Sequence, residues 1–368
     1  MKFVCAGIDL SDAVLKVVKA CASKTTLPVL ECIKIFAKND GVTLTATDGE
    51  IAIQKKFLAD VYEEGEICVP GKYFADFIKK LEGVEIGINV YNNKMDITYA
   101  DSQSSMAVLP SEDFPKIDTT ISENNFVINT AELKKCINAT SFAASTDDSR
   151  PILKGCQFLI KGDDLCVTAL DGFRLATYSG KIVSSTGDME IICPARTLNE
   201  IEKMLPLSEE NTQIFVQRGM IMVSVENTLL TSRLYNGDFI KKENIIKKDY
   251  TTFVTVNREA LKSSIERAAI LVRSDKNSLV IFDVCDDKIE VSSNSEIGNV
   301  QEPVKAIVEG KDLKIAMNSK FITEAINALD EEEITLSFNN NVQPFICQNK
   351  QDKNVLYLIL PVRMANNA

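Results

Sequence analysis

Residues 166–175 read Cys166-Val-Thr-Ala-Leu-Asp-Gly-Phe-Arg-Leu175, a strand-like stretch that runs into an Asp-Gly pair. The same pattern occurs earlier as Val42-Thr-Leu-Thr-Ala-Thr-Asp-Gly-Glu-Ile51, and Asp48 lies 123 positions before Asp171. A fainter third version is Ile289-Glu-Val-Ser-Ser-Asn-Ser-Glu-Ile297. Alternation with a period of two predicts a half-buried strand, and Asp-Gly predicts a turn. The chain therefore repeats a strand and a turn.

Two further landmarks recur at nearly the same interval. One is a strand followed by a helix, predicted at Ile67–Leu81, Ile191–Leu205 and Lys314–Leu329. The other is a strand that opens each unit, at Phe3, Phe126 and Phe253. All three landmarks give a period close to one third of the 368 residues. A unit of that length is a domain, because solenoid repeats are much shorter.

Each unit combines alternating strands with two amphipathic helices, which predicts an α+β fold with antiparallel sheet. We expect three tandem similar domains, at 1–120, 121–249 and 250–368. The six helices are predicted at Asp12–Cys21, Lys72–Glu82, Thr130–Thr140, Arg196–Leu205, Asn257–Ala268 and Ser319–Leu329. Asn257 has the side chain and the position of an N-cap.

Composition argues against several classes of protein. The chain has no histidine, and none of its ten cysteines forms a CxxC pair. A zinc site or a Cys–His nucleophile would need those residues, so we expect no metal, no catalytic residue and buried free thiols in a reducing cytoplasm. No apolar run reaches the roughly 18 residues of a membrane span. The N-terminus lacks a signal-peptide pattern, and no phosphate-binding glycine loop is present.

Three features together resemble the β subunit of bacterial DNA polymerase III, the sliding clamp family. They are the tandem units, the segments Leu27-Pro-Val-Leu30 and Leu170-Asp-Gly-Phe-Arg-Leu175, and the terminal Tyr357-Leu-Ile-Leu-Pro-Val-Arg-Met364. The resemblance covers essentially the whole chain. It implies the DNA clamp fold, in which a head-to-tail homodimer closes six domains into a ring with helices lining the hole.

The resemblance also implies a function. Members are cytoplasmic processivity factors for DNA replication, without enzymatic activity or cofactor, that encircle duplex DNA without sequence preference. They tether the replicative DNA polymerase and other proteins with clamp-binding motifs, and a clamp-loader ATPase complex opens the ring. No membrane partner is implied.

Charge is compatible with a ring around DNA. The net charge of −11 argues against a general nucleic-acid binder. The six predicted helices carry 13 Lys/Arg and 9 Asp/Glu, which leaves −15 on the rest of the chain. A ring that encloses DNA needs only weak attraction to the phosphates. The alternative is that these charges belong to an ordinary solvent-exposed helix face. Candidate DNA contacts are Lys16, Lys19, Lys24, Lys79, Lys80, Lys134, Lys135, Arg150, Arg196, Lys203 and Arg258.

Matching onto the family also implies a peptide-binding cleft between the second and third domains. Its residues would be Leu153, Leu170, Gly172, Phe173, Arg174, Leu175, Ile240, Ile245, Leu358, Leu360, Pro361, Val362, Arg363 and Met364. The alternative is that Leu358, Leu360 and Val362 are ordinary strand core. The chain departs from the family where Phe173 replaces His and Ile240 replaces Pro, and Ala365–Ala368 follow the motif. These departures bear on peptide preference.

The subunit interface can be matched as well. Ala268-Ala-Ile-Leu271 resembles the interface helix of the third domain, with Ile270 and Leu271 as contacts. Its partner would be a first-domain strand with Ser104 and Met106, and Lys72 would pair with Glu296. Ile270 and Leu271 could instead be core residues.

Two other functions compete with the clamp. A three-domain interaction scaffold without a DNA role would have the same repeats. An enzyme could use Asp48 and Asp171 as catalytic carboxylates, but an Asp-Gly turn explains both more simply. The third repeat has Ser295 at the corresponding position, so a shared carboxylate is missing there.

Overall fold

The computed structural model describes residues 1–39, 41–247, 249–272 and 278–364. The chain divides into two compact units. One contains Met1–Thr130, Val183–Thr186 and Glu200–Leu234, and the other contains Ala131–Ile182, Gly187–Asn199 and the chain from Tyr235 onward. Each unit therefore contains parts of more than one sequence repeat.

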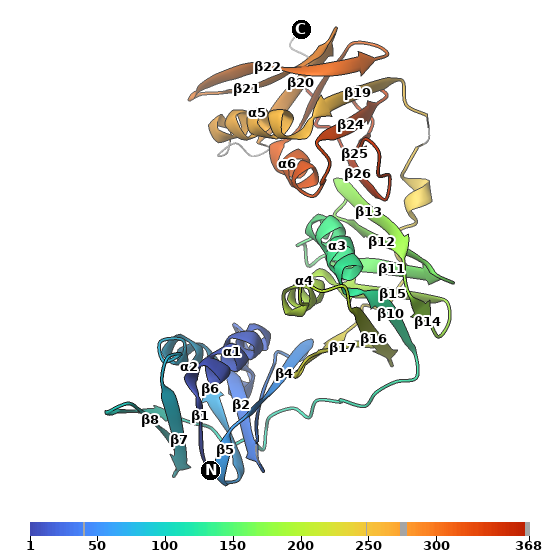
Figure 1. Ribbon diagram of the computed structural model, residues 1–368. Coiled ribbons are helices and arrows are strands. Elements are labelled where there is room, and N and C mark those ends of the chain that lie inside the picture. Colours follow the sequence, from blue (N-terminus) through green and yellow to red (C-terminus); the bar gives the residue numbers. More distant parts are fainter. Residues whose placement is uncertain (40, 248, 273–277, 365–368) are drawn as a thin grey trace. The chain divides into compact units, whose positions relative to one another are not determined.

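The three repeats have the same order of elements (Figure 1). The first consists of β1 (Lys2–Ala6), α1 (Gly7–Val17), β2 (Cys32–Lys38), β3 (Gly41–Thr47), β4 (Ile51–Leu58), β5 (Asp60–Glu63), β6 (Gly65–Pro70), α2 (Gly71–Ile78), β7 (Glu85–Tyr91), β8 (Lys94–Tyr99) and β9 (Ser102–Ala107).

The second repeat consists of β10 (Asn125–Asn129), α3 (Thr130–Thr140), β11 (Gly155–Lys161), β12 (Asp164–Leu170), β13 (Arg174–Lys181), β14 (Ser184–Ser185), β15 (Met189–Pro194), α4 (Ala195–Met204), β16 (Asn211–Gln217), β17 (Met220–Val225) and β18 (Thr228–Arg233). Short 3-10 turns flank its strands at η3 (Ser141–Ala143), η4 (Pro151–Lys154) and η5 (Lys242–Asn244).

The third repeat consists of β19 (Thr252–Asn257), α5 (Arg258–Leu271), β20 (Leu279–Cys285), β21 (Lys288–Ser295), β22 (Gly298–Glu309), β23 (Leu313–Asn318), α6 (Ser319–Asn327), β24 (Glu333–Phe338), β25 (Phe345–Asn349) and β26 (Val355–Ile359). The long β22 replaces two strands, because it pairs with β21 and then with β19. Every strand pair is antiparallel, and each repeat has two helices among the described residues, which confirms the predicted fold class.

Consecutive repeats are joined by one strand pair. The order β6-β2-β3-β4 of the first repeat continues into β18-β17-β16-β10-β14 of the second. The order β15-β11-β12-β13 of the second repeat continues into β26-β25-β24-β19 of the third. We call the pairs β4–β18 and β13–β26 the first and second junctions. In both, the last strand of one repeat extends the sheet of the repeat before it.

The helices begin where a cap or a close packing contact sets them. The Asn257 side chain accepts from the Ala260 N–H at 2.9 Å, as predicted, and α5 then buries Leu261 and Ile265. In contrast, α1 begins at Gly7 and not at the predicted Asp12. The Gly7 N–H donates to Val84 at 2.9 Å, and a Cβ atom at Gly7 would lie 2.0 Å from a backbone oxygen. Packing therefore sets this start without a polar cap.

The observed helix bounds change the charge pattern. The helix α2 ends at Ile78, so Lys79 and Lys80 follow it, and α1 gains Asp9. The six helices then carry 10 Lys/Arg and 9 Asp/Glu, fewer basic residues than predicted. Several candidate phosphate contacts therefore lie just beyond helix ends.

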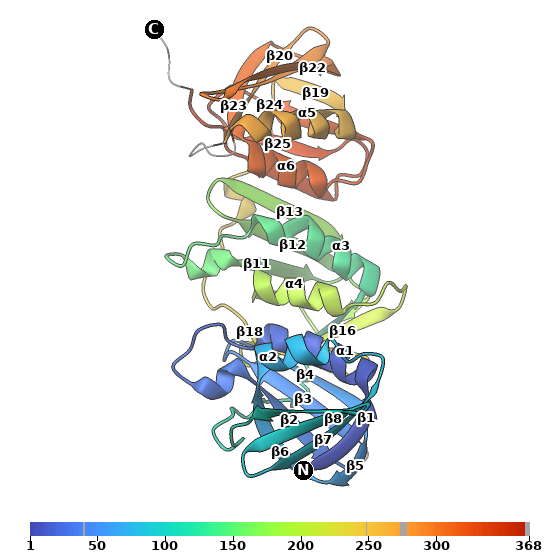
Figure 2. The same ribbon diagram turned by 90° about the vertical axis from the view of Figure 1, so that its left-hand side faces the viewer.

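The helices α5 and α6 pack together on one face of the third repeat (Figure 2).

Candidate functional site

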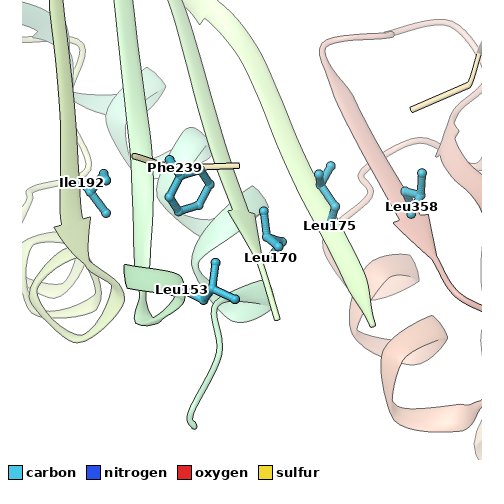
Figure 3. Close-up of a cluster of buried hydrophobic side chains, with 6 residues drawn as sticks. All are labelled: Leu153, Leu170, Leu175, Ile192, Phe239 and Leu358. Atoms are coloured by element: carbon cyan, nitrogen blue, oxygen red, sulfur yellow. The ribbon is translucent and has the colours of Figure 1, made fainter. Parts of the chain in front are cut away.

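Three leucines form a row across the second junction. Leu170, at the end of β12, lies opposite Leu175 on β13, and Leu175 lies opposite Leu358 on β26. Directly opposed residues of an antiparallel pair share a face of the sheet, and the three side chains lie side by side in Figure 3. They are 3, 2 and 1% exposed respectively.

Side chains from three other segments complete a buried cluster with this row. Leu153 comes from η4, Ile192 from β15, and Phe239 from the segment after β18 (Figure 3). We call these six residues the apolar cluster. Partly buried side chains pack around it at Ile152, Tyr235, Ile245, Ile246, Leu356 and Leu360. Burial of each leucine contributes roughly 1.5–3 kcal/mol, so the cluster also holds the second junction together.

The Asp-Gly pair forms the predicted turn. The Asp171 Oδ1 atom accepts from the N–H groups of Phe173 at 2.9 Å and Arg174 at 3.0 Å. Gly172 has a φ of +93°, which a residue with a side chain adopts only with strain. Asp48 makes the same two bonds in the first repeat. Both carboxylates are therefore turn formers, as the simpler interpretation predicted.

Arg174 is buried beside the cluster and is surrounded by partners from its own chain. Its side chain is 7% exposed. The Nε atom donates to Asp171 at 3.0 Å, Nη2 donates to the Phe142 carbonyl at 2.7 Å, and Nη1 donates to Glu324. The guanidinium carbon lies 5.3 Å from the Phe142 ring centroid and 4.7 Å from that of Phe321. Sequence reasoning placed Arg174 at the site without these partners.

An aromatic pair lies next to this guanidinium. Phe173, which is 61% exposed, stacks on Phe321 of α6 with ring centroids 6.1 Å apart. Phe321 and Glu324 are three positions apart on one helix, so they share a face. That spacing was visible in the sequence, but nothing in it indicated that this face meets Arg174. Sequence reasoning therefore missed Phe142, Phe321 and Glu324.

The predicted residues near the C-terminus run beside the cluster. The Leu360 N–H donates to the Phe173 carbonyl at 2.9 Å, and the Val362 N–H donates to the Ala316 carbonyl at 2.8 Å. Arg363 is exposed, while Pro361, Val362 and Met364 are half-buried. The predicted tail Ala365–Ala368 lies outside the described residues.

The segment after β18 contributes Phe239 to the cluster, a residue that sequence reasoning did not name. Ile240 is 40% exposed and lies outside the apolar cluster, whereas its neighbour Phe239 is 6% exposed and belongs to it. The Lys242 Nζ atom, 2.9 Å from the Cys166 Sγ atom, fastens this segment to β12. Ile245 then packs at the edge of the cluster.

The other repeats have polar or small residues where the second junction has leucine. At the first junction the corresponding row is Thr47 opposite Ala52 and Ala52 opposite Thr231. In the third repeat the corresponding pair is Asn294 opposite Asn299. Arg174 is the residue that closes the turn in the second repeat. The residue at the equivalent position is Ile51 in the first repeat and Gly298 in the third. An apolar row therefore occurs at one of the three equivalent places.

The candidate DNA contacts lie on helices or in the segments that follow or precede them, and several have acidic neighbours. Lys16 pairs with Asp12, and Lys203 pairs with Glu200. Lys135 lies 3.3 Å from Asp352 and 3.7 Å from Asp330. Arg258 pairs with Glu259 and donates to the Leu329 carbonyl. The remaining candidates are Lys19 and Lys24 after α1, Lys79 and Lys80 after α2, Lys134 on α3, Arg150 before η4 and Arg196 on α4.

The candidate interface residues lie at two places. Ser104 and Met106 are on β9, which pairs only with β8 among the described residues. Ile270, 68% exposed, and Leu271 form the last turn of α5. Lys72 is exposed at the start of α2, and Glu296 is exposed in the turn before β22.

All ten cysteines are free, and seven of them are buried, as predicted. Burial raises the pKa of the Cys68 and Cys156 thiols to about 12, which keeps them protonated at neutral pH. Within the described ranges, no cluster of His, Cys, Asp or Glu is arranged to hold a metal ion. No helix in that part of the chain is long and apolar enough to cross a bilayer.

Three family models match along the chain. They are the N-terminal domain of the DNA polymerase III beta subunit at residues 1–118, its central domain at 127–241 and its C-terminal domain at 243–363. Curated relatives named beta sliding clamp, from Staphylococcus epidermidis and Staphylococcus aureus, are each 33% identical over 356 residues. Those matches cover 94% of this chain and 94% of each relative.

Solved structures are similar over the same extent. The crystal structure of the DNA polymerase sliding clamp from Bacillus subtilis has a TM-score of 0.92 and 31% identity, covering 99% of this chain and 100% of that one. A structure described as a DNA polymerase III beta subunit from Eubacterium rectale has a TM-score of 0.91 and 30% identity at the same coverage.

Proposed function

The chain belongs to the DNA polymerase III beta subunit, or beta sliding clamp, family, and from that premise we propose how its residues perform the clamp's task. Its function is that of a replication processivity factor. We propose that two copies join head to tail into a ring that encircles duplex DNA and tethers the replicative polymerase. The observation that carries this proposal is the way in which consecutive repeats join.

Two strand edges remain where a further junction would form. At the first junction β18 extends β4, and at the second β26 extends β13. The equivalent of β18 and β26 in the first repeat is β9, which pairs only with β8 among the described residues. In the third repeat the equivalent of β4 and β13 is the first half of β22. Within the described ranges, this half pairs only with β21. Pairing β9 of one copy with β22 of another repeats the internal junction.

The internal junctions also predict the register of this pairing. Thr231 lies opposite Ala52, and Leu358 lies opposite Leu175. When the β8–β9 ladder is aligned with the β17–β18 ladder, Ser105 is equivalent to Thr231. When the β21–β22 ladder is aligned with the β3–β4 ladder, Asn299 is equivalent to Ala52. We therefore expect Ser105 opposite the partner subunit's Asn299 and Ser104 opposite the next residue along β22. The predicted contacts Ser104, Met106, Ile270, Leu271, Lys72 and Glu296 remain part of this proposal.

Enclosure explains why modest basic charge suffices. A sliding protein needs attraction to phosphates without base-specific contacts, since each specific contact would act as a brake. Non-specific binding of this kind has a Kd of only about 10⁻⁴–10⁻⁶ M, but a closed ring cannot dissociate sideways. Lys79 and Lys80, just beyond the end of α2, and Lys24, in the loop after η1, are exposed and are the contacts we favour. Lys135 and Arg258 contribute less, because acidic neighbours offset their charge.

The apolar cluster supports a docking place for partner peptides. Its floor is buried leucine, and the adjoining segments carry accessible apolar side chains, which we call the rim, at Phe173, Ile240, Leu360, Val362 and Met364. Apolar side chains of a peptide would bury against this rim, with a few backbone groups fixing its direction. We assign the C-terminal segment of the replicative polymerase to it, with the clamp loader and other motif-bearing proteins as competitors.

We infer further that the chain performs no catalysis of its own and that its domains are 1–120, 121–249 and 250–368. The family's role is non-catalytic, and the two repeated aspartates are engaged in turns. The proposed boundaries lie in segments between β9 and β10 and between η5 and β19.

Cross-linking tests the ring closure. Ser105→Cys combined with Asn299→Cys is expected to give a disulfide-linked dimer, because directly opposed residues have Cβ atoms about 4.5–5.5 Å apart. The measurement is a non-reducing gel after mild oxidation. The matched control is Ser104→Cys with Asn299→Cys, since a slip of one residue turns the side chains to opposite faces. Equal yields from the two pairs, or no dimer from either, would refute the proposed junction.

A further inference from the structure

Arg174 is the one charged residue among the three that close the equivalent turns. The first repeat has Ile51 at this position and the third has Gly298. A guanidinium taken out of water costs several kcal/mol unless good hydrogen bonds replace the lost hydration. At the turn-closing position a buried ion, 7% exposed, therefore occurs in the second repeat and not in the other two, which indicates a task specific to this turn.

The partners of Arg174 come from separate parts of the fold. Asp171 belongs to its own turn in the second repeat. Phe142 lies in η3, which follows α3, and offers both its carbonyl and its ring. Glu324 and Phe321 lie on α6 of the third repeat. One planar side chain thus connects a turn, a 3-10 segment and a helix across the second junction.

The connected parts also carry the rim of the apolar cluster. Phe173 is adjacent to Arg174, stacks on Phe321 and accepts from the Leu360 N–H through its carbonyl. Arg174 itself lies opposite Ile359 in the junction ladder. A shift of this guanidinium would therefore move Phe173, Phe321 and the strand end at Leu360 relative to the leucine row.

We propose that Arg174 is a positioning residue that sets the peptide-docking rim and does not itself bind the peptide. This rests on the docking role proposed above. Two carboxylates and a carbonyl engage three of its nitrogen atoms, and two rings cover it. A peptide carboxylate gains nothing from this residue. Recognition at this end of the site is therefore apolar and aromatic, through Phe173 and Phe321.

Peptide affinity of charge variants tests this assignment. The probe is a fluorescein-labelled peptide from the C-terminus of the replicative polymerase, read by anisotropy with the full-length protein. A variant of this peptide, the acidic peptide, has one neutral residue replaced by Asp. Arg174→Met is expected to weaken both peptides equally, by about tenfold, because small displacements of a docking surface are costly. Arg174→Lys restores little, since one ammonium cannot reach all three partners.

Glu324→Gln separates positioning from direct binding. Positioning predicts weaker binding of both peptides, because α6 is then held less firmly. Direct recognition predicts tighter binding of the acidic peptide, because the guanidinium is released. The matched control is Lys181→Met. Lys181 lies on the same strand as Arg174, β13, and forms an exposed ion pair with Asp164 of β12, so its replacement is expected to leave peptide affinity unchanged.

A tryptophan reporter gives a second readout. The chain contains no tryptophan, so Phe173→Trp introduces a single emitter at the rim. Adding Arg174→Met is expected to shift its emission to longer wavelength below the unfolding temperature. An unshifted spectrum with unchanged peptide affinity would overturn the positioning role alone. A wild-type protein that binds neither peptide would instead overturn the docking role.

Discussion

Single residues distinguish the second junction from its equivalents. Leu170, Leu175 and Leu358 form a row there, where the first junction has Thr47, Ala52 and Thr231. The backbone ladders are alike, so side-chain chemistry alone makes one place apolar. This difference would restrict the proposed peptide docking to one of the three equivalent places.

Leu358→Thr tests the row directly. The substitution is expected to weaken binding of the polymerase peptide at least tenfold and to lower the free energy of unfolding by about 2–5 kcal/mol, since it leaves a hole in a packed core. Anisotropy and urea unfolding measure the two effects. Leu230→Ala is the matched control, because Leu230 is fully buried on β18 at the first junction. If the control weakens peptide binding as much as Leu358→Thr, general destabilisation is the cause.

At this scale the sequence predicted the leucines but not their surroundings. Matching onto the family named Leu153, Leu170, Leu175 and Leu358, and the structure buries all four in one cluster. Phe239 lies in an irregular segment, which has no periodicity, and the prediction did not include it. The partners of Arg174 could not be read either, because Glu324 is 150 positions away and only the fold brings it near.

Among the elements, strands define the fold more clearly than helices do. The repeated strand and turn were visible from alternation and Asp-Gly, and the ladders bear them out. The capped helix α5 was predicted at its start, whereas α1 was placed five residues late because packing of Gly7 sets its beginning. The pairing of β4 with β18 and β13 with β26 could not be predicted, since it depends on long-range register.

The β8–β9 hairpin, which carries the proposed interface edge, is held by a carboxylate. Asp96 accepts from Tyr91 at 2.7 Å and Gln103 at 3.1 Å, and Lys94 lies 3.1 Å away. The Tyr91 hydrogen bond, with smaller effects of Lys94 and Gln103, lowers the pKa of Asp96. A lowered pKa in the folded state stabilises the protein above the ordinary value of about 3.9, and that stabilisation is lost as pH falls through the folded pKa.

Asp96→Asn should therefore reduce the melting temperature at pH 7 and have a smaller effect at acid pH, where the wild-type carboxylate is protonated. Thermal unfolding followed by circular dichroism across pH 2–8 measures this. The variant should also dimerise less tightly at pH 7, because β9 loses support. A constant difference between the two proteins over the whole pH range would show that the charge of Asp96 does not matter.

For the whole molecule, three similar domains supply two internal junctions and leave two complementary edges, on β9 and β22. We propose that two copies satisfy those edges head to tail, which would close the assembly. A scaffold without a DNA role would use the same repeats but would have no need of closure. Closure is therefore the property on which the proposed function depends.

Retention on DNA of defined topology tests closure most directly. The protein is loaded by its clamp loader onto nicked circular DNA, isolated with it, and followed after a restriction enzyme linearises the circle. We expect the protein to stay on the circle and to be lost through the free ends of the linear product. Equal retention on both forms would mean that adhesion holds the protein, and failure to remain on the circle would mean that no ring closes. Either result would refute ring closure as the basis of retention.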